Sequence, residues 1–519
     1  MVESFPVAFL FFAGAALLFV LPKGAARAAL LLVVPVLAAF IVWSLPEGNL
    51  WTARLFGLEL EFTRVDRLSR IFALIFTLAA FLGNLYAWHV RDTVQQVAAL
   101  LYAGSAIGAV FAGDLITLFL YWEGTAIASV FLIWARRTEG AYHTGMRYLI
   151  IQIGSGVLLL AGAALYWRET GSLTFEAMTL GSPATWLIFT AFGIKCAFPL
   201  LHNWLQDAYP AATVTGTVIL SAFTTKLAVY SLARGFPGTE MLIYIGAIMT
   251  LFPIFFAVIE NDLRRVLAYS LNNQLGFMVV GIGIGTELSL NGTAAHAFAH
   301  ILYKALLFMS VGAVLFRTGT AKGSELGGLY KTMPLTMIFC VVGAASISAF
   351  PLFSGFISKS LILSAASHDG YYIVWGILLF ASAGVFHHSG IKIPYFAFFA
   401  HDSGLRPKEA PTHMLLAMGL TAFLCIAIGV YPAPLYALLP YDVDYVPYTT
   451  FHVVTQLQLL FFSALAFTVL MLTRIYPPEM KSVNLDFDWT YRRFLPSVIS
   501  RVSGAVSAFW SAKLRFWQR

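Results

Sequence analysis

Long apolar runs separated by short polar stretches make up most of the chain. The runs lie at about 5–21, 26–44, 68–88, 94–112, 114–134, 146–167, 183–201, 212–233, 240–259, 264–284, 294–316, 333–364, 371–395, 411–430 and 452–474. An α-helix needs about 20 apolar residues to cross a bilayer, and these unbroken runs lack the alternation of a membrane barrel. The pattern predicts an all-α polytopic membrane protein with about 14–15 transmembrane helices.

Two of the runs are too long or too interrupted to be continuous helices. Pro199 follows Lys195 in one run, and Pro351 and Gly355 precede Lys359 in another. Proline removes a backbone hydrogen bond, so each break should face polar protein or water. Because the breaks lie at comparable places in two blocks of five runs, we expect two inverted five-helix repeats, each containing a broken helix.

These features divide the chain into five predicted segments. They are N-terminal transmembrane helices with an external loop (1–93), a first repeat (94–234), a second repeat (235–396), C-terminal transmembrane helices (397–474) and a basic amphipathic tail (475–519). Alternating apolar and polar residues within 45–67 predict a short β-hairpin in the external loop. The tail interleaves aromatic and basic residues, which predicts a helix lying on the lipid surface, with a disordered tail as the alternative.

Composition excludes several classes of protein. Mean hydropathy is +0.80, and 59% hydrophobic against 11% charged residues excludes a soluble globular protein. The net charge of +7 has its largest cluster in the tail, which favours lipid over nucleic acid as the partner. The three cysteines all lie in apolar runs without metal-ligand spacing, so we expect no disulfide, metal or cofactor.

The distribution of basic residues predicts the orientation. With the N-terminus outside, fourteen lysines and arginines, Lys392 among them, fall in inside loops and six in outside loops, and the tail adds eight inside. Positive loops face the cytoplasm. We therefore expect a multi-pass protein of the inner (plasma) membrane with a cytoplasmic tail, and the first run is expected to be a helix rather than a signal peptide.

Four lysines remain, and each lies inside an apolar run. They are Lys195, Lys226, Lys304 and Lys359. A charge at bilayer depth costs roughly 2.5 to 3.5 kcal/mol, so such residues normally face a bundle interior or a water-filled cavity. The alternative is a structural lysine that snorkels to the interface. Lysine, unlike arginine, can gain and lose a proton in such surroundings, which suits proton transport.

Glu123 is the natural counter-charge, because it also lies in the middle of an apolar run. We expect Glu123 to pair with Lys226, since a pair that forms and breaks gives one site two proton affinities. The alternative is a static buried ion pair. Asp114 is expected to cap a helix, and the stretch after Pro199 adds His202 and Asp207 as accessory polar groups.

Three titratable residues are spaced four apart in HAFAHILYKALLFM. His296, His300 and Lys304 therefore lie along one face of a helix and are expected to form a proton wire. A structural role for the histidines is the alternative. A zinc site is not expected, because the motif has neither the intervening glutamate of HExxH nor a third ligand nearby.

Several motifs in order resemble the antiporter-like subunits of respiratory complex I and of Mrp-type cation/proton antiporters. They are YWEG (121–124), GIKCAFPLLHNWLQDAYPAA (193–212), TTKLAVY (224–230), DLRRVLAYSLNNQLGFM (262–278), HAFAHILYKALLFM (296–309) and FPLFSGFISKSL (350–361). Among these subunits the chain resembles the Mrp D-type most, also in NLDFDWTYRR (484–493). Relatives usually have LPDA where this chain has Leu205, Gln206, Asp207 and Ala208, and many have AYSS where it has Ser270, Leu271 and Asn272, which leaves the shape of the first break open.

The resemblance implies a fourteen-helix core and roles for particular residues. Glu123 with Lys195 or Lys226 would be the carboxylate–lysine pair, His296, His300 and Lys304 the central relay, and Lys359 the terminal lysine. The chain would be an ion-transport subunit rather than an enzyme, working with sister membrane subunits on protons and sodium. The alternative is the proton channel of a redox-driven (NADH dehydrogenase- or hydrogenase-like) or inorganic-carbon-uptake complex, with any redox or hydrolytic chemistry in partner subunits.

Overall fold

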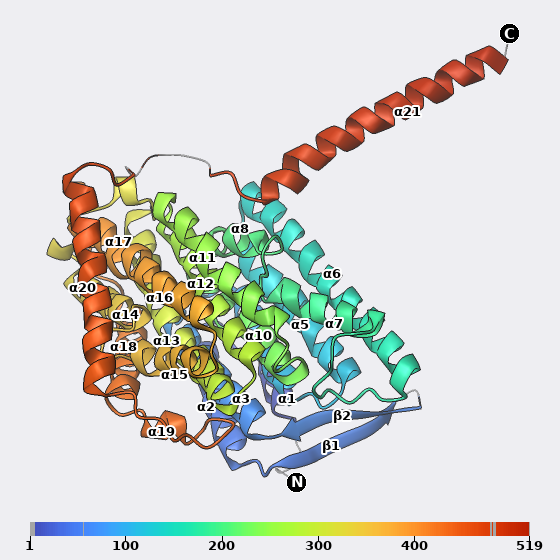
Figure 1. Ribbon diagram of the computed structural model, residues 1–519, viewed down its shortest axis with the longest axis horizontal. Coiled ribbons are helices and arrows are strands. Elements are labelled where there is room, and N and C mark those ends of the chain that lie inside the picture. The colour runs from blue at the N-terminus through green and yellow to red at the C-terminus, as the bar shows by residue number, and fades with distance from the viewer. Residues whose placement is uncertain (1–5, 56, 478–479, 481–483, 518–519) are drawn as a thin grey trace. The chain divides into compact units, whose positions relative to one another are not determined.

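The computed structural model describes residues 6–55, 57–477, 480 and 484–517. The chain forms two units, Met1–Met480 and Lys481–Arg519 (Figure 1). The second unit contains the π-helical turn η6 (Thr490–Phe494) and the helix α21 (Leu495–Trp517). All residues with a predicted role in transport lie in the first unit.

The first unit is almost entirely helical. Its α-helices are α1 (Val7–Val20), α2 (Ala25–Ser44), α3 (Arg67–Tyr86), α4 (Thr93–Phe111), α5 (Leu115–Trp134), α6 (Glu139–Thr170), α7 (Pro183–Lys195), α8 (Asn203–Ala211), α9 (Val214–Leu220), α10 (Thr224–Gly235), α11 (Met241–Ile259), α12 (Leu263–Ile284), α13 (Glu287–Thr318), α14 (Pro334–Ile347), α15 (Ser354–His368), α16 (Tyr372–Val385), α17 (Lys392–Pro394), α18 (Thr412–Val430), α19 (Ala433–Tyr436) and α20 (Thr450–Leu472). Short 3-10 turns, η2 (Gly323–Glu325) and η3 (Leu329–Lys331), and π-helical segments, η4 (Phe386–Ile391) and η5 (Tyr395–Phe399), complete it.

The all-α polytopic architecture is confirmed. Within the described residues, eleven helices are long and apolar enough to cross a membrane. The other four predicted runs correspond to the short helix α1, the more polar α12, and the interrupted pairs α7–α8 and α14–α15. The predicted run boundaries and the breaks at Pro199 and Pro351 therefore match helices of the structure.

Polar contacts between helix ends show which ends share a side of the bundle. The strands β1 (Gly48–Leu55) and β2 (Leu58–Val65) form the predicted hairpin, and they lie at the same end of the bundle as α19 (Figure 1). Arg64 of β2 donates to the carbonyls of Gly113 and Phe175. We call this end the hairpin side. Arg264, which donates to carbonyls at the end of α8, lies at the opposite side.

Two blocks of the chain have the same order of elements. The block α4 to α10 and the block α11 to α17 each contain a 19-residue helix, a helix capped by an aspartate, a 32-residue helix and a broken helix. The capping residues are Asp114 and Asp262, and each also forms an isolated β-bridge after the 32-residue helix. Each block crosses the membrane five times, an odd number, so the second block runs in the opposite direction to the first.

The two breaks share one backbone conformation. Both have the sequence Ala-Phe-Pro-Leu, and in both the alanine and the leucine are left-handed, with φ of 60° at Ala197, 70° at Leu200, 58° at Ala349 and 74° at Leu352. The amide of Phe198 bonds to the carbonyl of Gly193, as that of Phe350 does to Ala345. The replaced proline in the following LQDA stretch therefore leaves the first break with the same shape as the second.

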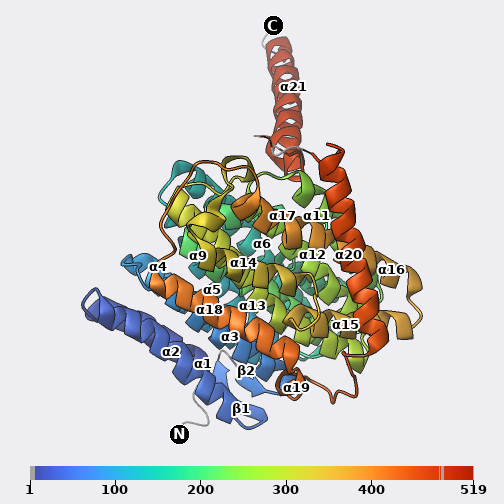
Figure 2. The same cartoon turned by 90° about the vertical axis from the view of Figure 1, so that its left-hand side faces the viewer.

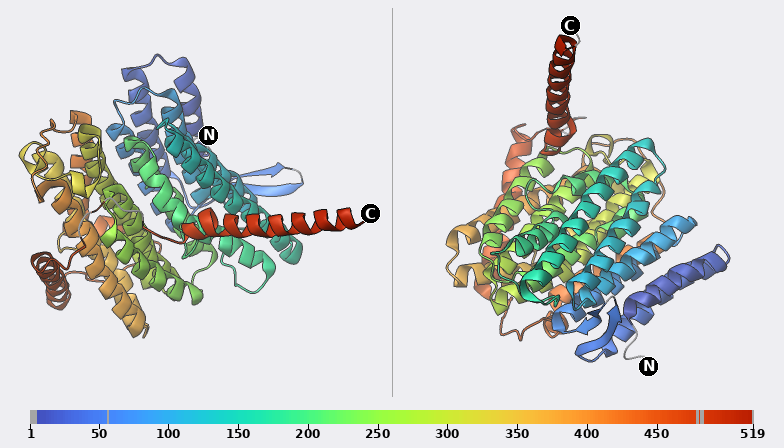
Figure 3. Two further views of the ribbon diagram at one scale, coloured as in Figure 1. Left: turned by 90° about the horizontal axis from the view of Figure 1, so that it is seen from above. Right: turned by 90° about the vertical axis from the view of Figure 1, so that its right-hand side faces the viewer.

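The long helix α13 lies at the centre of the bundle. In its most apolar window 94% of the residues are buried, against 17% for α20 and 39% for α2, which lie at opposite edges of the bundle (Figure 2). The outer helices expose large apolar side chains such as Phe40 and Phe461, as expected for contact with lipid. Figure 3 shows the hairpin projecting past the neighbouring helices.

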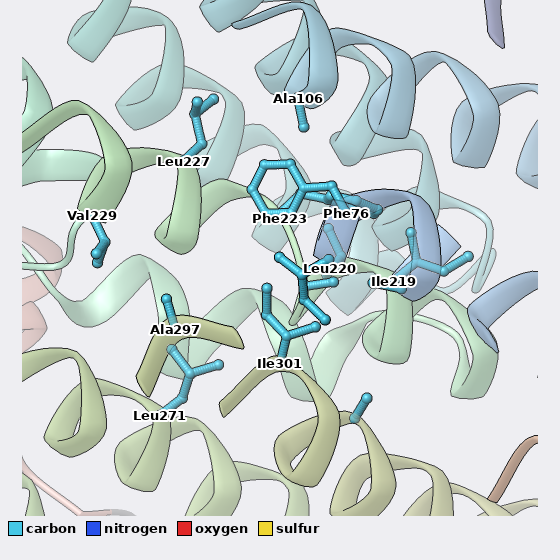
Figure 4. Close-up of a cluster of buried hydrophobic side chains, with 14 of the residues drawn as sticks. Phe76, Ala106, Ile219, Leu220, Phe223, Leu227, Val229, Leu271, Ala297 and Ile301 are labelled. Carbon is cyan, nitrogen blue, oxygen red and sulfur yellow. The ribbon is translucent and has the colours of Figure 1, made fainter. Parts of the chain in front are cut away.

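A buried apolar cluster packs α3, α9, α10, α12 and α13 together. Phe223, between α9 and α10, makes edge-on ring contacts with Phe76 of α3 and Tyr102 of α4. Leu271 of α12 and Ile301 of α13 belong to the same cluster (Figure 4). Close packing here fixes the helices that carry the buried titratable side chains.

Candidate proton-translocation site

Lys195 is the last residue of α7 and is completely buried at the first break. Its ammonium donates hydrogen bonds to the carbonyl of Trp122 at 2.6 Å and to the hydroxyl of Thr125 at 2.9 Å, both in α5. It also lies 4.4 Å from the centre of the Trp122 ring. The ammonium is therefore held by neutral oxygens and an aromatic face.

Glu123 lies beside Lys195 rather than beside Lys226, so the predicted pairing is wrong. Among the described residues Glu123 forms no direct ion pair, and the lysine whose charge acts on it is Lys195. The reason is the fold: α5 packs against α6, and Lys195 reaches α5 from the end of α7. Gly156 of α6 leaves the space that the Glu123 carboxylate fills, since a Cβ there would overlap Oε1.

Lys226 occupies the interior between the two blocks. It is fully buried in the first turn of α10 and donates to the carbonyl of Ser221, at the junction between α9 and α10, at 2.6 Å. Its charge acts on Cys196 at the first break and on His296 and His300 of α13. Lys226 thus connects the first block electrostatically with the second.

The predicted row on α13 is present and wholly buried. His296, His300 and Lys304 have no exposed surface, and the two imidazole rings are 6.2 Å apart. His296 Nδ1 bonds to the hydroxyl of Ser358 at 3.0 Å. Neither ring nitrogen of His300 has a partner within the described part of the chain. Buried polar atoms normally have a hydrogen-bond partner, so the His300 ring is an exception within the row.

Lys359 lies on α15, after the second break. Its ammonium donates to the carbonyl of Ile347, the last residue of α14, at 2.8 Å, and lies 5.1 Å from the centre of the Phe277 ring. Its charge acts on His296 and Lys304. The neighbouring Ser358 contacts His296, so the second break adjoins the α13 row.

His202 and Asp207 do not join this row. Asp207 forms an ion pair with Arg147 of α6 at 2.8 Å, and the His202 ring lies 4.5 Å from that of Phe252 of α11. Both lie on the α8 side of the first break, away from Glu123 and Lys195. These contacts join Asp207 to α6 and His202 to α11.

Sequence reasoning missed a second polar group, on the π-helix η4. His388 and Ser389 are fully buried, and Lys392 just after η4 is fully buried as well, so its prediction as a loop residue is wrong. Lys392 donates to the carbonyls of Ala257, Val258 and Glu260 at the end of α11. Two adjacent histidines in the run 371–395 could have indicated this polar group. Lys392 could not, because a lysine at the end of an apolar run is typical of a loop.

A cavity opens from the hairpin side toward the α13 row. It has a volume of about 440 Å³ and is lined by charged residues at its rim, Asp66 and Arg234 among them. Thr293 and Ala294 of α13 also line it. They precede His296 by less than one helical turn, so the cavity leads to the end of the histidine row.

The rim of this cavity contains a strong ion pair. Arg234 donates two hydrogen bonds to the Asp66 carboxylate, at 2.8 and 2.7 Å. Burial by itself raises the pKa of Asp66, but the charge of Arg234 and the hydrogen bonds from Ser69 and Arg234 outweigh it and hold the pKa below its usual value. Asp66 therefore stays charged at neutral pH and fixes the start of α3 to the end of α10.

These buried titratable side chains form a series through the bundle. It runs from Glu123 and Lys195 to Lys226, then to His300, His296 and Lys304, and on to Lys359. Charge interactions link Glu123 with Lys195, Lys226 with His300, His300 with His296 and Lys304, and Lys304 with Lys359. Lys226 approaches the first lysine through its interaction with Cys196, the residue next to Lys195. Unpartnered buried atoms occur on Thr225 and His300, on helices that carry the series, and on Gln152 and Asn272, on helices α6 and α12 that pack against them. Water at such atoms would connect groups that do not touch.

Comparisons with known proteins show which family the chain is similar to. Residues 112–427, more than half of the chain, match the family described as "NADH:quinone oxidoreductase/Mrp antiporter, TM". Hydrogenase-4 component B of Escherichia coli (strain K12) is 27% identical over 70% of this chain and 62% of its own length. The D-type Na(+)/H(+) antiporter subunit of Alkalihalophilus pseudofirmus is 31% identical over 57% of this chain and 64% of its own length.

The fold also matches a solved complex. A chain in the structure of the Mrp complex from Dietzia sp. DQ12-45-1b superposes with a TM-score of 0.83 at 24% identity, over 96% of this chain and 59% of that chain. The matched region spans 41% to 62% of the length of similar curated relatives. From the family match over 112–427, the chain belongs to the NADH:quinone oxidoreductase/Mrp antiporter transmembrane family.

Proposed function

We propose that this chain is a proton-translocating subunit of a multi-subunit cation/proton antiporter that exchanges protons for sodium. The observation that carries the proposal is the state of the four lysines predicted from the sequence. Lys195, Lys226, Lys304 and Lys359 are at most 1% exposed, and within the described residues none forms an ion pair with a carboxylate.

Such lysines are poor structural elements but good proton carriers. A purely structural buried ammonium is expected to have a paired carboxylate, because an unpaired charge costs several kcal/mol. An ammonium held only by carbonyls, hydroxyls and ring faces can release its proton to a neighbour and regain it. Glu123 beside Lys195 supplies a counter-charge that favours loading of the first lysine, and the α13 row continues the path to Lys359.

The setting of the subunit follows from its relatives. Similarity to a D-type antiporter subunit supports the same role here, with sister membrane subunits around the lipid-facing helices. We place the protein in the plasma membrane as a multi-pass subunit, with the hairpin side outside and the C-terminal unit in the cytoplasm, on the distribution of basic loop residues.

A second candidate is the proton channel of a redox-driven complex. It is supported by the similarity to a hydrogenase component. In that assembly the same residues would move protons, while partner subunits carry the redox chemistry. The buried series is common to both candidates, and only the driving reaction differs.

Proton flux in vesicles containing the intact complex tests the proposal. A pH-sensitive dye inside the vesicles should report proton release on a pulse of sodium chloride, and Lys304→Ala should abolish it without loss of assembly. Flux that appears only with an electron donor would favour the redox-driven candidate. Wild-type flux in assembled Lys304→Ala would contradict both.

A further inference from the structure

A continuous chain of hydrogen bonds leads from Lys304 to the π-helix η4. The Lys304 ammonium donates to the hydroxyl of Ser270 on α12 at 2.8 Å. The hydroxyl of Ser389 on η4 bonds to Ser270 at 2.7 Å, and His388 Nδ1 lies 2.9 Å from Ser389. All four side chains are completely buried. Three elements therefore place four proton-carrying groups in direct sequence.

This chain can carry a proton because its hydroxyl hydrogens can rotate. In the arrangement seen, Ser389 donates its single hydrogen to Ser270, so His388 Nδ1 donates to Ser389. When His388 carries its hydrogen on Nε2 instead, Lys304 can give a proton to Ser270, Ser270 one to Ser389, and Ser389 one to Nδ1. One proton leaves Lys304 and one arrives on His388, so the transfer balances.

The far end of the chain points toward the side opposite the hairpin. His388 Nε2 and Nε2 of the adjacent His387 are both buried, and neither has a partner in the described residues. His387 is partly exposed and packs on Phe467 and Tyr476, the latter just beyond the end of α20. The charges of Lys304 and His387 both act on His388. The two histidines therefore lie between the central row and a membrane face.

The π-helical geometry brings these groups together. A π-helix widens the backbone by one residue per turn, and such segments are often found at functional sites. Here it places His387 outward and His388 and Ser389 inward, although they are adjacent in the chain. Lys392 holds the segment by donating to three carbonyls at the end of α11, which is a structural role.

We propose that Ser389, His388 and His387 form a branch that connects Lys304 with the membrane face opposite the hairpin. The main series ends at Lys359 and the cavity near His296, which opens on the hairpin side. The branch supplies the missing connection to the other side, so protons reach Lys304 from there. This inference rests on the proposed function, because it assumes that Lys304 carries protons.

Three variants test the branch in the assembled complex. Ser389→Ala removes one hydroxyl, and His388→Asn keeps an amide that can bond to Ser389 but cannot carry a proton. His387→Asn removes the outer imidazole. Ser382→Ala is the matched control, because Ser382 is buried on the adjoining helix α16 and its hydroxyl is outside the chain. Proton flux after a sodium chloride pulse, and then a potassium chloride pulse, is the readout.

We expect each of the three variants to lower proton flux about tenfold or more, as for loss of a proton-transfer group, while Ser382→Ala keeps wild-type flux. Wild-type flux in any of the three assembled variants would overturn the branch. If one of the histidine variants does not assemble, the flux of Ser389→Ala alone tests the branch, since this substitution removes a single oxygen atom. Lys304→Ala distinguishes failure of the branch from failure of the proposed function. If Lys304→Ala loses flux while the three branch variants keep it, only the branch is refuted. If Lys304→Ala keeps normal flux, the proposed function is refuted.

Discussion

A single glycine determines where the carboxylate beside Lys195 can lie. Gly156 on α6 faces Glu123, and any side chain there would occupy the position of the carboxylate oxygen. Gly154, two residues earlier on the same helix, has no atom within 4 Å of its Cβ position. A side chain is therefore excluded at Gly156 but has space at Gly154 on the same helix.

Gly156→Ala should displace the Glu123 carboxylate from Lys195 and lower proton flux about tenfold. A tenfold loss corresponds to a rise of about 1.4 kcal/mol in the activation free energy of transfer. Gly154→Ala is the control, and it should keep full flux with a slightly more stable helix. Dye-based flux measurements on both assembled complexes make the comparison. Equal flux in the two variants would show that the carboxylate position does not matter.

Coupling of Glu123 with Lys195, and its independence from Lys226, can be measured directly. In Glu123→Gln, flux should fall sharply, and adding Lys195→Ala should make it little worse, because these residues act together. Adding Lys226→Ala should lower flux further by an independent amount. Since removal of one member of a buried pair can cost about 3–5 kcal/mol, assembly of each variant must be verified first. Additive effects for Glu123 with Lys195 would contradict the pairing.

The residue types were predictable from the sequence, but their neighbours were not. A charged residue inside an apolar run stands out by its cost in lipid, which identified Glu123 and the four lysines. Pairing depends on distances between helices that are remote in the chain, so the sequence does not distinguish Lys226 from Lys195 as the partner of Glu123. His388 was missed because it lies in a run whose only lysine is at its end.

At the scale of elements, the two broken helices store strain in the same way. Left-handed conformations are unfavourable for residues with a Cβ, yet four such residues occur in the two Ala-Phe-Pro-Leu breaks. Leu200 and Leu352 are 58% and 56% exposed, so packing of their side chains does not offset the free energy of the left-handed conformation. The breaks persist because the half-helices on either side are fixed by their neighbours.

Leu352→Gly is expected to leave the free energy of unfolding unchanged or raise it by about 0.5 kcal/mol, because glycine adopts a positive φ without strain. Leu416→Gly is the matched control: Leu416 is 55% exposed in the second turn of α18, and glycine there should cost about 1 kcal/mol. Thermal unfolding in detergent compares the two. A larger loss for Leu352→Gly would indicate that its side chain is needed at the break.

The junction of α3 and α10 should respond to acid. Asp66 has a pKa below its usual value of 3.8, so its pair with Arg234 stabilises the fold above that pH and is lost as the pH falls through the lower folded value. Asp66→Asn keeps the helix cap but removes the charge. We expect the wild type to be more stable than Asp66→Asn by about 1 kcal/mol at pH 7, a value reduced for partial exposure.

Unfolding temperatures of both proteins between pH 7 and pH 3 check this expectation. The difference should stay constant above the usual aspartate pKa of about 4 and shrink below it. A difference that persists unchanged at pH 3, or that appears only at high pH, would rule out the ion pair as its source.

Elements were predicted better than residues. The lengths of the apolar runs predicted the helices, and the alternation of apolar and polar residues predicted the hairpin, which lies at 48–65. The prolines predicted both breaks. The common shape of the breaks was not foreseen, since the replaced proline in the LQDA stretch left the first of them open. Local backbone geometry follows the Ala-Phe-Pro-Leu sequence that both breaks share, and the stretch after it has little influence.

At the scale of the whole molecule, the chain should fold without its C-terminal unit. The unit after Met480 has its own internal contacts, and the titratable series lies entirely before it. A chain ending at Met480 keeps Tyr476 and its stacking on His387. We expect its unfolding temperature to match that of the full chain, while the amount of assembled complex falls. Normal assembly with lost flux would contradict this expectation.

The inverted blocks and the lysines do not obey the same symmetry. In the first block Lys195 precedes its break, and in the second Lys359 follows its break, yet inversion brings both to the half-helix nearer the hairpin side. If the two blocks were related by an exact two-fold axis, Lys195 and Lys359 would lie at equivalent positions on opposite sides of the membrane. Proton transfer outward and inward would then be equivalent. If the lysines carry protons as proposed, we expect this placement of the charges to make the barriers for forward and reverse transfer different, although the two backbone halves are nearly alike.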